Sequence, residues 1–152
     1  MDLNMAIESS ESLDEFVSHE REYKEVVSAL IIQNGKALLM RRAAHETFPG
    51  AYELPGGTVE ENETHQQAIT REIFEETSLP VTVIRALLGS FEFPSQSDTN
   101  ARNFVYLTEI EEGAVVLSEE HDDYLFINPE EAFELQLSPN ARHALGMFST
   151  NA

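Results

Sequence analysis

Residues Gly57–Leu79 read GTVEENETHQQAITREIFEETSL and follow directly on a second glycine, Gly56. On a helix, Glu72, Glu75 and Glu76 stand at positions i, i+3 and i+4 and therefore share one face. Three carboxylates on one face repel one another unless water solvates them fully or a hard divalent cation neutralises them. The spacing favours the cation, so this segment predicts a helix that contributes acidic ligands to a metal site.

The composition describes an acidic protein with one globular domain. The chain has 152 residues, of which 41% are hydrophobic, and a net charge of −19, and this length is enough for a real core. No apolar run approaches the roughly 18 residues that a membrane span needs, and the N-terminus does not resemble a signal peptide, so we expect a cytoplasmic protein without a membrane partner. The absence of cysteine excludes disulfides and thiolate metal sites.

The negative charge also bears on the partners. Affinity for nucleic acid comes mainly from lysine and arginine on phosphates, and the chain has only nine such residues. We therefore expect no stable nucleic-acid binding. An anionic small molecule would be repelled as well, so an anionic substrate requires bound cations at the site, in agreement with the carboxylate face.

We divide the chain into an acidic helical appendage, residues 1–24, and a single domain, residues 25–152. In the appendage, Leu13, Phe16 and Val17 form a short apolar stripe that predicts one amphipathic helix, packed on the domain or on another subunit.

The domain reads as strands interleaved with a few helices. A hairpin is expected over Glu25–Gln33 and Lys36–Arg41, around an Asn-Gly turn. The acidic helix is expected to begin at Thr64, in a T-x-x-Q capping box, and to end before Pro80. Further strands are expected at Tyr52–Leu54, Val81–Phe93, Arg102–Ile110 and Tyr124–Ile127, and further helices from Asn128-Pro129 and from Ser138-Pro139 to about Phe148. This pattern predicts a mixed sheet covered on both faces.

The acidic segment resembles the signature of the Nudix hydrolases, the MutT-like enzymes: G-x5-E-x7-R-E-U-x-E-E-x-G-U, in which U is bulky and aliphatic. The positions that fit are Gly57, Glu63, Arg71, Glu72, Ile73, Glu75, Glu76 and Leu79. Ser78 departs from the pattern, because the family has its second glycine there. The resemblance implies an α/β fold, the Nudix-type α/β/α sandwich around a mixed β-sheet, and a homodimer as a possible assembly.

The resemblance also implies a site that binds Mg²⁺ or Mn²⁺. Its ligands in this chain would be Glu72, Glu75 and Glu76, with a backbone carbonyl near Gly56. Glycine at Gly56 and Gly57 lets the backbone approach the metal and the phosphates of a substrate without a Cβ in the way.

Arg71 resembles the family arginine that holds the catalytic glutamates by ion pairing, and it also has the i, i+4 relation to Glu75. Glu63 has two explanations. It either takes a direct part in the site or stabilises the start of the helix through the helix dipole.

A second acidic run, Glu119–Asp123 (EEHDD), lies where family members often carry a further metal-binding or general-base glutamate. Glu120 is our candidate, although Glu119 and the two aspartates compete with it, and the run could also be a plain surface loop. Either Glu120 or Glu72 would be the base that activates water. We expect His121 to be structural or exposed, because magnesium sites prefer oxygen ligands.

Residues outside the signature would set the substrate. Arg41 and Arg42 end a strand and either contact a phosphate or base or are simply solvated. Tyr52 stands where the family often has tryptophan, and packs in the core or stacks on a base. Pro94 lies near the distance after the signature at which a proline marks ADP-ribose hydrolysis in the family, but it could merely end a strand.

We therefore expect divalent-metal-dependent hydrolysis of the pyrophosphate bond in a nucleoside diphosphate linked to another group, either an ADP-ribose-like compound or a nucleoside triphosphate. The alternative is a nucleotide-binding Nudix module with weak or no catalysis, which Ser78 favours because serine adopts a left-handed helix end less readily than glycine. An acidic interaction protein would leave the placement of Gly56, Gly57 and Arg71 unexplained.

Overall fold

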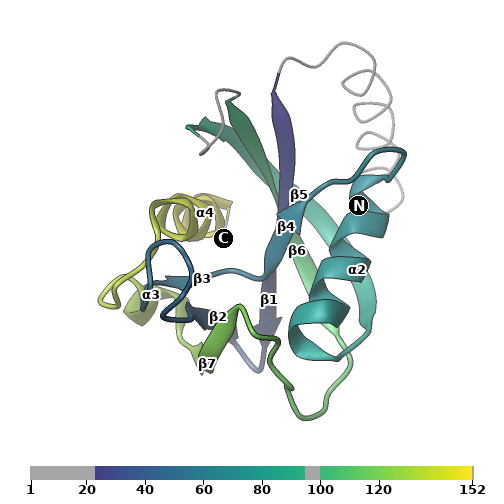
Figure 1. Cartoon of the computed structure of the whole chain (residues 1–152). Helices are drawn as coiled ribbons and strands as arrows, with labels where there is room; N and C mark the ends of the chain where they lie inside the picture. The colour runs from purple at the N-terminus through teal and green to yellow at the C-terminus, as the bar shows by residue number, and fades with distance from the viewer. Residues whose placement is uncertain (1–22, 95–99, 152) are drawn as a thin grey trace.

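A mixed sheet of seven strands forms the centre of the structure, a computed structural model that describes residues 23–94 and 100–151 (Figure 1). The strands are β1 (Lys24–Gln33), β2 (Lys36–Arg42), β3 (Tyr52–Glu53), β4 (Gly56–Thr58), β5 (Val81–Phe93), β6 (Ala101–Ile110) and β7 (His121–Ile127). The helices are α2 (His65–Thr77), α3 (Pro129–Ala132) and α4 (Pro139–Asn151). None of these helices is long and apolar enough to cross a membrane.

β1 is the strand around which the sheet is organised. The main path runs β3-β2-β1-β6-β5, with β4 attached to β1 and β7 attached to β2. β1 is parallel to β6 and antiparallel to its other partners. Along its other edge, Val26–Ser28 pair with β4, whereas Ile32 and Gln33 pair with β2. This change of partner places the two glycines of β4 in the middle of the molecule, between α2 and β3 (Figure 1).

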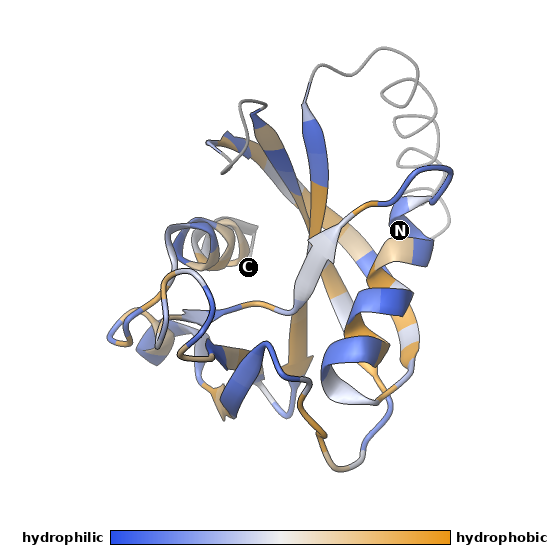
Figure 2. Ribbon diagram, in the orientation of Figure 1, coloured by the Kyte–Doolittle hydropathy of each residue, from blue (hydrophilic) through white to orange (hydrophobic). Residues whose placement is uncertain are grey.

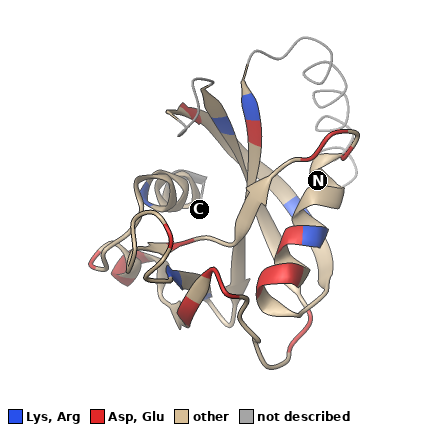
Figure 3. Ribbon diagram, in the orientation of Figure 1, with Lys and Arg blue, Asp and Glu red and all other residues tan. Residues whose placement is uncertain are grey.

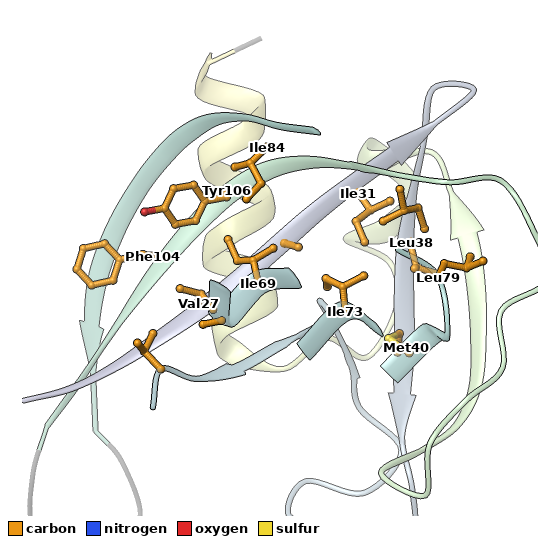
Figure 4. Packing of buried hydrophobic residues seen from close by; sticks show 14 residues of the cluster. Val27, Ile31, Leu38, Met40, Ile69, Ile73, Leu79, Ile84, Phe104 and Tyr106 are labelled. Carbon is orange, nitrogen blue, oxygen red and sulfur yellow. The ribbon is translucent and has the colours of Figure 1, made fainter. Parts of the chain in front are cut away.

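The strands place alternate side chains in two separate hydrophobic clusters, one on each face of the sheet. In β1, Val27, Ala29 and Ile31 belong to the first cluster, and Leu30 belongs to the second. α2 contributes Ala68, Ile69 and Ile73 to the first cluster (Figure 4), and α4 contributes Ala144 and Leu145 to the second. The apolar colour in Figure 2 accordingly follows the strands, while α2 turns polar residues outward. The predicted α/β/α sandwich is confirmed.

Both ends of α2 are fixed by local hydrogen bonds. The Thr64 hydroxyl accepts from the backbone N–H of Gln67 at 3.1 Å, and the Gln67 side chain accepts from the backbone N–H of Thr64 at 2.9 Å. The predicted capping box is therefore confirmed. At the other end, Ser78 adopts the left-handed conformation (φ 65°, ψ 16°), and its N–H donates to the carbonyl of Phe74 at 2.9 Å. Serine thus takes up the backbone conformation for which the signature uses glycine.

The predicted hairpin and the other expected strands and helices are present, and besides shifts of one residue at several strand ends there are three larger differences. β4 was not predicted, because Gly-Gly-Thr carries no strand pattern. β7 begins at His121 rather than at Tyr124, and α4 continues to Asn151. The helix expected around Leu13 lies outside the described residues, so the appendage and the boundary at residue 24 stay predictions.

Candidate active site

Arg71 is the centre of an ion-pair network that fixes the loop before α2 to the helix. Its guanidinium donates to both oxygens of Glu63, at 2.7 and 2.9 Å, to Glu72 at 2.9 Å and to the carbonyl of Thr58 at 3.1 Å. The hydrogen bond from Arg71 lowers the pKa of Glu63, and these partners, Glu63 foremost, raise the pKa of Arg71. Glu63 therefore positions Arg71, and Arg71 in turn positions Glu72.

Glu76 is a buried carboxylate with no cationic side chain beside it among the described residues. It is 4% exposed and accepts a hydrogen bond from the backbone N–H of Gly56 at 3.0 Å. Burial raises its pKa well above the ordinary value, and the charges of Glu72 and Glu120 raise it further. Burial likewise raises the pKa of Glu72, against the opposing effect of Arg71. Isolated buried charge is unfavourable unless it is neutralised, so this environment suits a bound cation.

The two glycines make room for these carboxylates. A side chain on Gly57 would collide with the carboxylate of Glu72, and one on Gly56 would collide with the backbone of Val27. The close approach of β4 to β1 thus requires glycine at position 56, whereas glycine at position 57 leaves room for the carboxylate of Glu72.

Glu120 and His121 come to the site from the start of β7. One carboxylate oxygen of Glu76, one of Glu120 and one ring nitrogen of His121 all lie within 4.8 Å of one another. His121 is 4% exposed, and its Nε2 lies 2.8 Å from Oε2 of Glu53. Figure 3 shows the acidic positions of α2 and of the start of β7 in red. We expected His121 to be either structural or exposed. Because the residue is buried, the exposed alternative does not hold.

Two adjoining cavities open beside these groups. The smaller, about 230 Å³, is lined by Gly56, Gly57, Glu76 and Glu120 together with polar residues that include Asn103. The larger, about 560 Å³, has an apolar side made by Phe48, Phe93 and Pro94. Both cavities share the residues Val26, Arg42, Glu53, Ser138 and Asn140. A cleft therefore leads from the carboxylates to an apolar surface.

The other predicted site residues lie at different distances from this cleft. Arg42 lines both cavities and donates from Nη1 to both oxygens of Glu53 at 3.0 Å. Arg41 pairs with Asp122 at 2.7 Å and is not among the residues that line either cavity. Tyr52 packs against the second hydrophobic cluster, as its core alternative predicted. Glu75 is 56% exposed and lies 3.5 Å from Arg71. The proposed roles of all four stay predictions.

The cleft residues that were missed from the sequence include Glu53, Phe48 and Asn140. Glu53 precedes the Leu-Pro-Gly-Gly turn and joins Arg42 to His121. Phe48 is 65% exposed and has a positive φ of 52°, which is rare for a bulky residue. An isolated aromatic residue in a loop, between Thr47 and Pro49, was the only signal that the sequence offered for it.

Residues 22–147 match the family of the NUDIX domain. The chain belongs to this family. This match covers the whole of the described cleft, and the prediction that the chain is a Nudix-type hydrolase is confirmed.

Named relatives agree with the family. The chain is 32% identical over 117 residues to a CTP pyrophosphohydrolase of Escherichia coli K12, covering 76% of this chain and 83% of that protein. It is 40% identical over 70 residues to an ADP-ribose pyrophosphatase of Methanocaldococcus jannaschii, covering 46% of this chain and 40% of that protein. Among solved structures, the MutT protein of Methanosarcina mazei Go1 superposes with a TM-score of 0.76 and 27% identity, over 87% of this chain and 96% of that one.

Proposed function

We propose that this protein hydrolyses the pyrophosphate bond of a nucleotide with the help of Mg²⁺ or Mn²⁺. The observation that carries the proposal is Glu76, a buried carboxylate without a cationic side chain among the described residues, which faces Glu120 at a glycine-lined cavity. Hard cations bind carboxylate oxygens in such a place. Two relatives are named for the hydrolysis of CTP and of ADP-ribose. Both compounds contain a nucleoside diphosphate linked to a further group.

The acidic residues have separate tasks in this proposal. Glu72, Glu76 and Glu120 would hold the cation together with the carbonyl of Gly56, and Glu75 would support them from the same helix face. A bound Mg²⁺ or Mn²⁺ would orient the diphosphate and lower the pKa of a water molecule. Glu72 or Glu120 accepts the proton of the attacking water.

The larger cavity is the place for the rest of the nucleotide. Phe48, Phe93 and Pro94 offer an apolar surface for a base, and Asn140 offers both a hydrogen-bond donor and an acceptor. A nucleoside triphosphate is the first candidate, because the relative that acts on CTP matches most of this chain. ADP-ribose is the second candidate, on the shorter match.

Product analysis tests this proposal directly. The protein is incubated with CTP, the other nucleoside triphosphates and ADP-ribose in Mg²⁺ or Mn²⁺, and the products are separated by anion exchange. We expect a nucleoside monophosphate in every productive case, with pyrophosphate from a triphosphate and a sugar phosphate from ADP-ribose. Glu76→Gln should lower turnover by more than about a hundredfold, whereas Glu112→Gln, an exposed acid outside the cleft, should not change it.

Binding of these nucleotides without turnover in either metal would contradict the proposal and favour the non-catalytic module. The structure gives that module no support of its own, because Ser78 keeps the left-handed helix end that its replacement of glycine put in question.

A further inference from the structure

We propose that His121 supplies a nitrogen ligand to a cation bound between Glu76 and Glu120, so that this position prefers Mn²⁺ or another transition-metal ion to Mg²⁺. The proposal rests on the metal site of the proposed function and adds to it a ligand that is not a carboxylate. Its basis is the grouping of the three side chains, whose ligand atoms lie within 4.8 Å of one another.

The hydrogen bonds of His121 leave one ring nitrogen available. Nε2 lies 2.8 Å from Oε2 of Glu53, and a carboxylate accepts hydrogen bonds, so Nε2 carries the proton. Nδ1 is buried and finds no hydrogen-bond partner in residues 23–94 and 100–151. Buried polar atoms are nearly always paired, and a bound metal ion would use the lone pair of Nδ1.

Glu53 connects the ring of His121 to Arg42. Both oxygens of Glu53 accept hydrogen bonds from Nη1 of Arg42 at 3.0 Å. A histidine whose other ring N–H is held by a carboxylate is the usual arrangement of histidine ligands in metal sites. Glu53 thus holds the ring of His121 in place, and Arg42 holds Glu53.

A nitrogen ligand changes the choice of metal. Mg²⁺ prefers oxygen ligands in octahedral geometry and retains several of its waters. Imidazole suits transition-metal ions, and the affinity of sites with nitrogen ligands rises along the first row from Mn²⁺ onward. Glu76 and Glu120 alone would accept either ion, so His121 is the residue that makes the difference.

Pulsed electron paramagnetic resonance of bound Mn²⁺ tests the proposal without any need for turnover. The full-length protein is loaded with Mn²⁺ alone, and the electron spin echo is examined for coupling to ¹⁴N. We expect this coupling in the wild type and in His45→Gln, whose side chain is 64% exposed, and its loss in His121→Gln. Protein labelled with ¹⁵N-histidine should exchange the ¹⁴N pattern for that of ¹⁵N, which tests the ligand even if His121→Gln fails to fold.

A titration followed by the signal of free Mn²⁺ gives the second readout. His121→Gln should bind Mn²⁺ at least about tenfold more weakly, because loss of groups that merely orient a ligand already has an effect of this size. Competition by Mg²⁺ should become correspondingly stronger in this variant.

The outcomes separate this proposal from the proposed function. Bound Mn²⁺ that shows no nitrogen coupling, or a coupling that persists in His121→Gln, overturns the histidine ligand, while hydrolysis supported by Mg²⁺ still upholds the enzyme. Absence of any Mn²⁺ binding overturns the histidine ligand as well. Nitrogen coupling in a protein that hydrolyses no nucleotide supports the ligand and contradicts the proposed function.

Discussion

Glu72 accepts a hydrogen bond from the guanidinium of Arg71 at 2.9 Å, and its carboxylate occupies the space that a side chain on Gly57 would fill. Gly57→Ala places a methyl group where the end of the Glu72 side chain lies. Because that end is flexible, we expect the carboxylate to move rather than the fold. Turnover should fall by about tenfold or more, in line with the loss of a correctly oriented ligand, while the melting temperature changes little.

Gly146→Ala in α4 is the matched control for this prediction. A Cβ at Gly146 meets nothing within 4 Å, and alanine favours a helix over glycine by about 0.5–1 kcal/mol. The control should keep full activity and gain slight stability. Full activity in Gly57→Ala would contradict the proposed place of Glu72 at the metal.

Single residues of the signature were predictable, whereas their partners were not. The helical spacing alone brought Glu72 and Glu76 to one face, because the period of a helix is fixed. The contact between His121 and Glu53 joins residues 68 positions apart and depends on β2 pairing with β7. No local pattern encodes that register, so the place of His121 beside Glu53 became visible only in the fold.

The end of α2 is the element in which this chain departs from its family. Ser78 has a φ of 65°. In that left-handed region a residue with a side chain lowers the stability of the fold by roughly 1 kcal/mol relative to glycine. Its hydroxyl donates one hydrogen bond of 3.4 Å to the carbonyl of Val116, and this bond is exposed to solvent, so it offsets little of that loss. Ser78→Gly should therefore raise the free energy of unfolding by about 1 kcal/mol, measured by urea denaturation.

The activity of the Ser78→Gly variant tests whether serine at this position affects the active site. Since the backbone already has the conformation of the signature glycine, Ser78→Gly should leave kcat and KM unchanged. An increase of kcat in the glycine variant would show that serine disturbs the site and would support the alternative of a weakened enzyme.

The loop between β2 and β3 carries the exposed aromatic residue of the cleft. Phe48 lines the larger cavity together with Phe93 and Pro94, and 65% of its surface is exposed. Stacking of a base on an aromatic ring contributes about 1–3 kcal/mol. Phe48→Ala should therefore raise KM for a nucleotide substrate by about tenfold and leave kcat nearly unchanged.

The matched control for Phe48 is Val116→Ala, an apolar residue that is 59% exposed and lies outside both cavities. This variant should keep the KM of the wild type. A KM for Phe48→Ala equal to that of the control would remove Phe48 from the nucleotide site.

At the scale of the whole molecule, periodicity predicted the layers but not the order of the strands. Alternation along β1 and the stripe on α2 account for the two clusters on either face of the sheet. The parallel pairing of β1 with β6 joins distant segments, and β4 is held by this framework rather than by its own Gly-Gly-Thr sequence. The family resemblance identified these layers as the Nudix-type α/β/α sandwich, and the central position of the glycines became known only from the structure.

The stability of the whole molecule should depend on pH and metal together. Burial raises the pKa of Glu76 and of Glu72 above 4.5, so between pH 4.5 and the raised pKa values these two residues bind more protons in the folded protein than in the unfolded chain. Their contribution to stability therefore falls as the pH rises through the raised pKa values. Glu63 has a lowered pKa, so its contribution to stability increases with pH. That contribution is fully present above pH 4.5 and does not change near neutral pH.

A divalent cation reverses this loss, because it binds the ionised carboxylates and favours their deprotonation. The rise in melting temperature caused by saturating Mg²⁺ should be small near pH 5 and larger near pH 7.5, as followed by differential scanning fluorimetry. In Glu76→Gln, which cannot ionise at this position, the dependence on pH should weaken and the effect of the metal should decrease. An equal shift by metal at both pH values would show that the cation binds elsewhere, on carboxylates that are ionised throughout.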